Sequence, residues 1–293
     1  MSILPENYKK VKKILWTILF VNLAVAAMKI IIGISIKSAS MTADGFHSLT
    51  DSSANIVGLI GVYFAAQPVD REHPYGHGKC EMFAGLLIAG MLFLLGGKII
   101  IDAVNRFLSP LLPEITPECL VLLLLTLCVN IFVSIFEYKK GRELNSQILV
   151  SDSLHTRSDI YISAGVLVAL ICIKLGLPPV IDPVASLIVA GFILHAAYEI
   201  VRDNGGILLD QAAVDADEIR NIVLSFDKVK DAHKIRSRGS KNDMHVDMHI
   251  MTAPDLNVEE CHELIHSIEE KIRNEISPKI QVIFHVEPYK GEV

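Results

Sequence analysis

The chain has 293 residues, of which 51% are hydrophobic and 20% charged, and its formal net charge at pH 7 is −6. Its mean hydropathy of +0.44 is too high for an ordinary soluble protein of this length and places the chain among membrane proteins. The negative charge argues against a nucleic-acid partner. The five cysteines are scattered without a CxxC pair, so we expect neither a disulfide framework nor a Cys-based zinc site.

The composition changes along the chain near residue 205. Long apolar runs fill residues 1–205, whereas most of the dense charge lies in residues 206–293. This change predicts a membrane domain over 1–205 and a soluble domain over 206–293, which is long enough to fold by itself. The N-terminus is basic and lacks a clear cleavage site, so we expect a retained first helix rather than a signal peptide.

Six segments of the first part contain the roughly 20 mostly apolar residues that a membrane-spanning helix needs. They run approximately over 14–36, 41–66, 80–107, 117–138, 148–175 and 180–202. Lys and Arg are concentrated before the first span, between the second and third, and between the fourth and fifth. By the positive-inside rule these segments face the cytoplasm. The prediction is a multi-pass protein of the lipid bilayer with both termini cytoplasmic, in the inner or plasma membrane of the cell.

Residues 206–293 change between helical and strand patterns. Ala216–Ser225 looks helical, and Asn257–Glu275 has an apolar helical stripe. Val229–Arg238, Met244–Met251 and Gln281–Glu287 have the character of strands. The order α-β-β-α-β predicts a small α+β sandwich in which both helices cover one face of a three-stranded sheet.

The second and fifth spans carry the same polar pattern: an Asp, a His three residues later, and an Asp four residues after that. The residues are Asp44, His47 and Asp51 in the second span and Asp152, His155 and Asp159 in the fifth. Residues three and four apart share one face of a helix. Charged groups at membrane depth are costly and normally face a bundle interior or a wet cavity. Two matching stripes therefore predict helices that face each other around a cation.

The chemistry of these side chains indicates a transition metal. His47, Asp51, His155 and Asp159 supply two imidazoles and two carboxylates, which suit a tetrahedral Zn2+. Imidazole also suits iron, cobalt and nickel, and oxygen ligands favour manganese, so the donor set alone does not fix the metal. Because these ligands must lose protons to bind a metal, we expect the site to exchange metal for protons.

Two further predictions concern the neighbours of this ligand set. Asp44 and Asp152 lie one turn away, where we expect them to support the ligands or to lie on the route by which the metal reaches them. Structural ion pairing is the competing interpretation, but it needs cations, and Arg157 is the one cation that we place near the motifs.

With these motifs, the chain resembles the cation diffusion facilitator family of divalent metal/proton antiporters. The resemblance covers nearly the whole chain: six spans, the paired HxxxD motifs and the tail. It implies metal efflux by a homodimer with a ferredoxin-like, metal-binding cytoplasmic domain. In the family, two His and two Asp at this site accompany a zinc preference, so zinc is the expected substrate. Iron, manganese, cobalt and cadmium stay open as alternatives, and we expect no organic cofactor.

The resemblance also implies a second metal site in the connection after the second span. By its chemistry alone, this short loop with two His and nearby acids is as well explained as a polar turn. The family resemblance favours a metal site made by Asp70, His73 and His77. In the family, a basic residue at the position of Lys79 pairs with an acid just after the sixth span, which is Asp210 here. This pair would join the two domains.

The tail contains six of the eleven His. His233, His249 and His285 fall on three different predicted strands and are expected to converge. The resemblance implies a regulatory metal site made by His233, His249, His262, His285 and Glu287. Glu287 stands where we expect Asp in the family, which leaves the number of metal ions in this site open.

Three other functions compete with a transporter. A passive channel would bind ions weakly at several places, whereas a compact four-ligand site favours a carrier. A metalloprotease would use H-E-x-x-H, which the chain matches from His262 to His266. We interpret this as a chance match in the soluble tail and expect no enzyme. A metal sensor that signals through its tail without transport is the third alternative.

Overall fold

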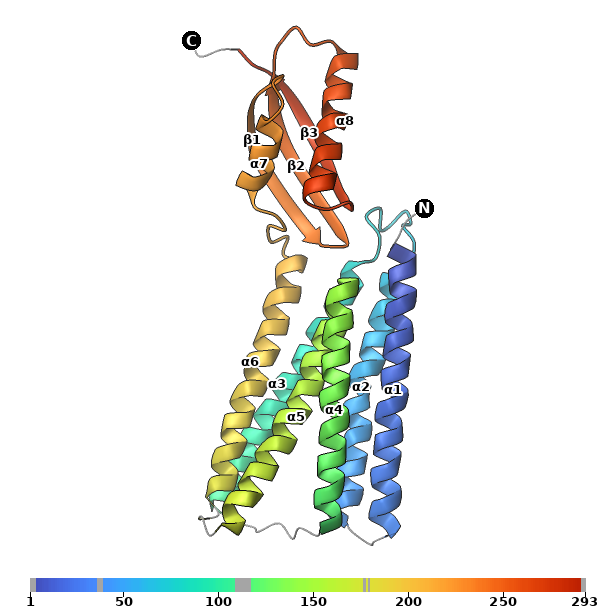
Figure 1. Cartoon of the computed structure of the whole chain (residues 1–293), viewed down its shortest axis with the longest axis vertical. Helices are drawn as coiled ribbons and strands as arrows, with labels where there is room; N and C mark the ends of the chain where they lie inside the picture. The colour runs from blue at the N-terminus through green and yellow to red at the C-terminus, as the bar shows by residue number, and fades with distance from the viewer. Residues whose placement is uncertain (1–3, 36–38, 109–116, 176–177, 179, 291–293) are drawn as a thin grey trace. The chain divides into compact units, whose positions relative to one another are not determined.

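The computed structural model describes residues 4–35, 39–108, 117–175, 178 and 180–290. Contacts divide the chain into two compact units, Met1–Gly205 and Gly206–Val293. The long helices are α1 (Leu4–Ser35), α2 (Ala39–Ala65), α3 (Lys79–Leu108), α4 (Pro117–Leu144), α5 (Gln147–Lys174) and α6 (Ile181–Leu208). The tail comprises α7 (Ala216–Leu224), β1 (Val229–Ser240), β2 (Asp243–Thr252), α8 (Val258–Glu275) and β3 (Ile280–Pro288) (Figure 1).

The first unit is a bundle that is apolar outside and polar inside. Large side chains such as Phe20, Leu94 and Phe132 are well exposed on its outer surface. Its interior, in contrast, buries Asn55, Glu137 and a series of other polar side chains. Hydrocarbon favours apolar side chains outside, and polar groups inside can find partners in the neighbouring helices. The arrangement is that of a helical transmembrane domain.

Three helices in the described part are long and apolar enough to cross a membrane. They are Asn7–Ile31 in α1, Lys79–Phe107 in α3 and Ile181–Leu208 in α6, while Ser52–Ala65 of α2 forms a shorter apolar stretch. A total of six spans therefore stays a prediction. The first helix begins at Leu4 rather than near residue 14, because the basic N-terminal segment is itself helical.

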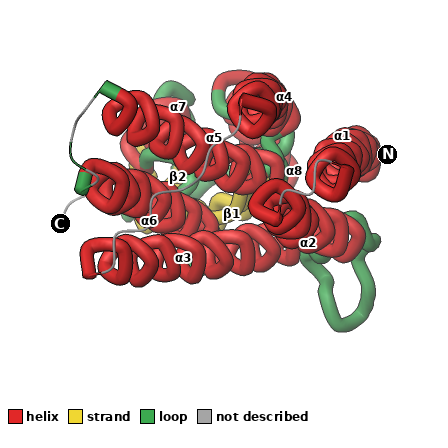
Figure 2. The backbone as a smooth tube through the Cα atoms, turned by 90° about the horizontal axis from the view of Figure 1, so that it is seen from below, coloured by secondary structure: helices red, strands yellow, loops and turns green. Residues whose placement is uncertain are grey.

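The bundle is held together by an apolar core and by close helix contacts. α1 packs along α2, α4 along α5, and α2 and α5 both contact α3 (Figure 2). Leu15, Ile88 and Ile148 are fully buried in this core. α2 and α3 lie so close at Gly61 that a Cβ atom there would be 2.3 Å from the Cβ of Ala84. Small residues permit such an approach of two membrane helices.

The second unit is a three-stranded sheet with both helices on one face. The strand order is β1-β2-β3; β1 pairs with β2 antiparallel, and β2 pairs with β3 parallel because α8 provides the crossover. Alternate residues of β2, such as Met244, Val246 and Met248, are buried against α7 and α8. The α-β-β-α-β order and the helix-covered face predicted from the sequence are confirmed.

Local sequence explains where the tail helices begin and which side they bury. The Asn257 side chain accepts a hydrogen bond from the backbone N–H of Glu260, whose carboxylate accepts one from the Asn257 N–H. This capping box starts α8. Arg220 of α7 donates a hydrogen bond of 2.8 Å to the Asp231 carboxylate on β1, so this helix is tied to the sheet by charge as well as by its apolar side.

Gly61→Ala should destabilise the bundle. The added methyl group meets a Cβ that is fixed to the α3 backbone, so the two helices must separate, at a cost of about 1–3 kcal/mol. We expect a lower midpoint of thermal unfolding in detergent. Gly97→Ala is the matched control, because a Cβ there would meet nothing within 4 Å. Equal midpoints for the two variants would contradict the close approach.

Asp231→Asn should weaken the attachment of α7 to β1 in a pH-dependent way. Arg220 beside Asp231 holds the pKa of this carboxyl below its usual 3.8. A depressed pKa stabilises the fold above about pH 4, and the contribution disappears as the pH falls through the folded-state pKa. At neutral pH we expect about 0.5–1 kcal/mol for this half-exposed pair, seen as roughly two- to fivefold faster hydrogen exchange in β1. Asp227→Asn, on the exposed turn nearby, is the matched control and should leave the exchange rate of β1 unchanged.

Candidate metal centre

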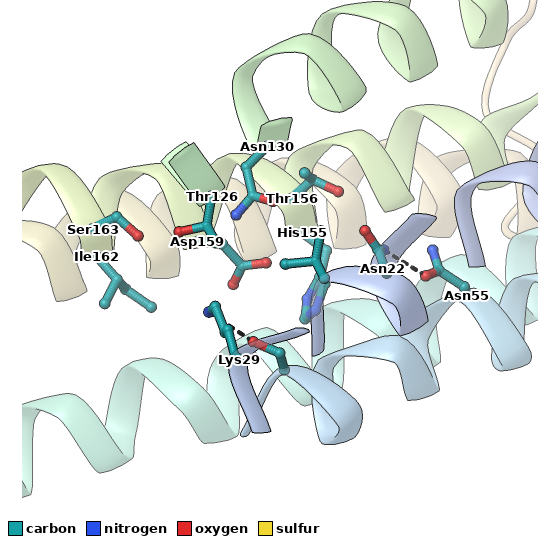
Figure 3. A pocket seen from close by; sticks show the side chains of 12 residues that line it. Asn22, Lys29, Asn55, Thr126, Asn130, His155, Thr156, Asp159, Ile162 and Ser163 are labelled. Atoms are coloured by element: carbon teal, nitrogen blue, oxygen red, sulfur yellow. Dashed lines mark hydrogen bonds between the residues drawn. The ribbon is translucent and has the colours of Figure 1, made fainter. Parts of the chain in front are cut away.

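A small polar cavity lies inside the helical bundle and contains the fifth-span motif. Its volume is about 90 Å3. Its walls come from α1, α2, α4 and α5 (Figure 3), and the lining residues are Asn22, Val25, Lys29, Ser48, Asn55, Thr126, Asn130, His155, Thr156, Asp159, Ile162 and Ser163. Most of these side chains offer oxygen or nitrogen atoms, which is unusual for the inside of a membrane bundle and typical of a polar-ligand site.

His155 and Asp159, two of the predicted metal ligands, both line this cavity. They stand one turn apart on α5, so both side chains reach the same space (Figure 3). The His155 side chain is buried, and neither ring nitrogen has a hydrogen-bond partner within the described residues. A buried imidazole without a partner is costly. A metal ion bound here would use one of these two nitrogens.

The other half of the predicted ligand set lies on α2. Asp44, His47 and Asp51 belong to this helix, but their side chains fall outside the described residues. The cavity is nevertheless lined from α2 by Ser48 and Asn55. The structure thus brings together the fifth-span half of the set and leaves the second-span half as a prediction.

Lys29 of α1 is a cation that the sequence interpretation overlooked. Its side chain lines the same cavity as Asp159, and both point into it in Figure 3. The Lys29 ammonium donates a hydrogen bond of 2.9 Å to the Ser48 hydroxyl. The premise that Arg157 is the one cation near the motifs is therefore wrong; the Arg157 guanidinium lies 4.6 Å from the centre of the Tyr138 ring. A charged residue inside an apolar run was the signal that could have identified Lys29.

Asp152, predicted to support the ligands, is fully buried and hydrogen-bonded across helices. The Asn55 amide donates to its carboxylate at 2.6 Å, and Asn22 donates to the Asn55 carbonyl at 2.8 Å. Asn22 and Asn55 line the cavity, so the wall of the cavity is connected to Asp152 through α1 and α2. Sequence reasoning missed these two asparagines because polar neutral residues give no charge signal within an apolar run.

The loop between α2 and α3 brings its three predicted ligands together. Ligand atoms of Asp70, His73 and His77 lie within 4.8 Å of one another. Gly76, at φ +85°, allows the turn in which the two His rings lie 4.2 Å apart. The backbone N–H of His73 donates to Asp70 at 2.6 Å, and this bond is the main cause that lowers the pKa of the Asp70 carboxyl. The carboxylate is therefore ionised and available to a cation.

The tail assembles a second candidate cluster on the sheet face that the helices leave open. His233, His249 and His285 are direct neighbours across β1, β2 and β3, with ring centres 5.4 and 4.5 Å apart. Glu287 lies 2.7 Å from the Nδ1 atom of His249 and 3.4 Å from the Nε2 atom of His233. The hydrogen bond with His249 is the main cause that lowers the pKa of the Glu287 carboxyl. His233, His249 and Glu287 converge tightly enough to hold a metal ion, with His285 beside them.

His262 does not join this cluster within one chain. It lies on α8, on the covered side of the sheet, and its Nε2 atom is 3.1 Å from that of His266. These two His are the ends of the H-E-x-x-H match. Both rings are exposed on the helix surface, and no third His, Cys, Asp or Glu among the described residues completes a three-ligand group with them.

The predicted pair of Lys79 and Asp210 spans the two units of the chain. Lys79 is the first residue of α3. Asp210 follows α6 with φ 55°, a left-handed conformation that Asp tolerates at a helix end. Its carboxylate lies 3.6 Å from the Arg238 guanidinium. The pairing with Lys79 stays a prediction.

Comparison with known proteins matches both units of the chain. Residues 15–209 match a family profile described as the cation efflux transmembrane domain, and residues 212–289 match the cation efflux protein cytoplasmic domain. An uncharacterized transporter of Methanocaldococcus jannaschii is 31% identical over 86% of this chain and 90% of its own length.

Two further relatives have names that include a function. The manganese efflux system protein MneP of Bacillus subtilis is 28% identical over 96% of this chain and 97% of its own length. The cation-efflux pump FieF of Pectobacterium atrosepticum is 27% identical over 92% of this chain and 89% of its own. No enzyme family is indicated. The chain is a multi-pass membrane protein of the cation efflux family, also called the cation diffusion facilitators.

Proposed function

We propose that this protein exports a divalent transition metal from the cytoplasm in exchange for protons, through His155 and Asp159 of α5 and His47 and Asp51 of α2. The observation that carries the proposal is the polar cavity inside the bundle that His155 and Asp159 both line. An imidazole and a carboxylate one turn apart are metal ligands by chemistry. A small site whose walls come from four helices, α1, α2, α4 and α5, favours a carrier over an open pore.

The position of α2 supports the other half of the ligand set. Ser48 and Asn55 line the cavity, and they stand three residues before and four residues after Asp51 in the sequence. Residues at this spacing share a helix face. His47 stands four residues before Asp51, so helical periodicity predicts that both reach the cavity.

Zinc is the first candidate substrate, because two imidazoles and two carboxylates suit a tetrahedral Zn2+. Manganese is the second candidate, and two observations favour it. The rest of the lining is rich in hydroxyl and amide oxygens, which suit Mn2+, and a relative aligned over 96% of the chain is named as a manganese efflux protein. Iron, cobalt and cadmium complete the set to be compared.

The topology proposed is six spans with both termini in the cytoplasm, in the inner or plasma membrane. The basic residues in the first turns of α1 and in the last turns of α4 support this orientation, and the tail matches a domain described as cytoplasmic. We propose that the protein is a homodimer whose tails meet. Metal held by His233, His249 and Glu287 would then report the cytosolic metal level to the dimer, which is linkage between two sites. The Asp70, His73 and His77 loop provides an additional cytoplasmic metal site in this scheme.

Asp159→Asn should abolish transport. The wild-type protein in liposomes with an imposed pH gradient should take up zinc or manganese in a saturable way. Removing a ligand should lower this uptake by at least about 100-fold, since losing partners outside the ligand shell already costs about 10–100-fold. Asp203→Asn, a matched change at the exposed end of α6, should behave like wild type. Comparing zinc, manganese, iron, cobalt and cadmium in the same assay names the substrate.

Equal uptake by Asp159→Asn and wild type would remove the cavity from the transport route. Metal-dependent changes in the tail without any flux would instead support the sensor function.

His249→Ala should remove metal-dependent protection of the tail. A metal that binds the folded sheet stabilises it by mass action, by about 2.7 kcal/mol when free metal is 100 times Kd. In the full-length protein, hydrogen exchange of β2 should therefore slow by up to about 100-fold with Zn2+. His266→Ala is the matched control and should retain the protection. If metal-dependent protection is lost in His266→Ala and retained in His249→Ala, the metal binds at α8 instead.

A further inference from the structure

Glu137 of α4 and Asp152 of α5 form a pair of carboxyl groups inside the bundle. Both side chains are 0% exposed, and the Thr156 hydroxyl connects them: it lies 3.0 Å from the Glu137 carboxylate and 3.2 Å from the backbone oxygen of Asp152, one turn earlier on α5. Neither residue lines the metal cavity in the described part. Glu137 is a charged residue in the apolar run of α4 that the ligand pattern does not explain.

The outer contacts of the pair come from the cavity wall. Thr156 donates a hydrogen bond of 3.0 Å to one oxygen of Glu137, and Asn55 donates one of 2.6 Å to one oxygen of Asp152. The remaining oxygens, Glu137 Oε1 and Asp152 Oδ1, are buried and have no partner within the described residues. Each carboxyl is thus anchored on one oxygen and unsatisfied on the other.

The surroundings supply no cationic side chain to this pair in the described part. The other titratable groups that act on it are His155 and Asp159, both on α5. α2 presents neutral Asn55. Other polar and charged side chains of the bundle have partners of their own. These are Glu81 of α3 with Ser146 and the Ile148 backbone N–H, Asn204 of α6 with Ser151, Lys29 of α1 with Ser48, and Arg157 with Tyr138.

Two carboxylates that are buried side by side cannot both ionise without a compensating cation. Sharing one proton resolves the conflict, because a protonated carboxyl donates a hydrogen bond to its neighbour. A shared proton would also satisfy the two oxygens that lack a partner.

We propose that Glu137 and Asp152 hold one proton between them and form the counter-ion site of the transporter, separate from the metal ligands. The inference rests on the proposed metal/proton antiport and names the groups that carry a proton in it. Asp152 stands one turn before His155 on α5, so a divalent ion at the cavity raises the positive potential at the pair. The ion therefore favours loss of the proton.

When metal binds at the cavity, the O–H bond of the shared carboxyl breaks, the electron pair stays on the oxygen, and one proton leaves. When metal departs, the carboxylate pair takes one proton back. Glu137 and Asp152 lie nearer the α4–α5 connection, which we predict to be cytoplasmic, than Asn130 and Asp159 of the cavity do. The pair is thus placed between the metal cavity and that end of the helices.

The test counts the protons released when metal binds to the full-length protein. Titration calorimetry of the protein in detergent, in two buffers of different ionisation enthalpy, gives protons released per metal bound. Wild type should release about one proton per protomer more than Glu137→Gln or Asp152→Asn. Glu143→Gln, an exposed change at the end of the same helix, should match wild type. In liposomes, Glu137→Gln should lose more of its pH-driven metal uptake than of its counterflow activity, the exchange of metal outside for metal inside. Counterflow needs no net proton movement.

Equal proton release from wild type, Glu137→Gln and Asp152→Asn would overturn the proposal. A variant that binds one metal ion fewer than wild type, with the same number of protons released per metal, would also overturn the proposal, because the pair would then be a metal site. If the variants do not fold, infrared difference spectra of the wild-type protein provide the test. Metal addition should remove the C=O band of a protonated buried carboxyl. An unchanged band would contradict the inference. Failure of all metal flux in wild type would reject the proposed transport function, whereas the proton count would still test the pair.

Discussion

A bundle that presents apolar side chains to lipid must place its polar groups inside, where each of them needs a partner. The rest of the membrane unit follows from this constraint. Hydrogen bonds run from Asn22 of α1 through Asn55 of α2 to Asp152 of α5, and Thr156 of α5 bonds Glu137 of α4. These contacts connect four helices at one level and leave the metal cavity among them. The same network therefore determines the packing of the helices and surrounds the ligands.

The tail obeys a different constraint, that of an ordinary soluble sheet with one covered face. The alternation of β2 directs Met248 and Ile250 to the helices and leaves His249 on the open face. Because the strands pair in register at His233, His249 and His285, three imidazoles become neighbours without any long-range fitting. A cluster of this kind depends only on strand register, which the buried face fixes.

Much of this architecture was predictable because it depends on local pattern. The αββαβ order and the shared face of His155 and Asp159 follow from residue spacing, whereas the convergence of Asp70, His73 and His77 was expected from the family resemblance. Other features depend on which helices lie side by side, and spacing within one helix does not contain that information. Lys29 and Glu137 were visible as charges in apolar runs, but their partners Ser48 and Thr156 come from other helices. His262 was placed with the sheet cluster on family resemblance, and the crossover helix takes it to the other face.

The ring of His155, which has no hydrogen-bond partner among the described residues, bears on how long a metal held there would stay bound. Metal-binding imidazoles are normally held in one tautomer and one orientation by a hydrogen bond to the second nitrogen. No group among the described residues does so for His155, so a metal bound by this ring would have to fix its orientation itself, at a cost in entropy. This cost lowers affinity and shortens the residence time of the ion. Weak, short-lived binding would be a disadvantage for a metal-storage protein. A carrier, in contrast, turns over faster when the transported ion dissociates easily.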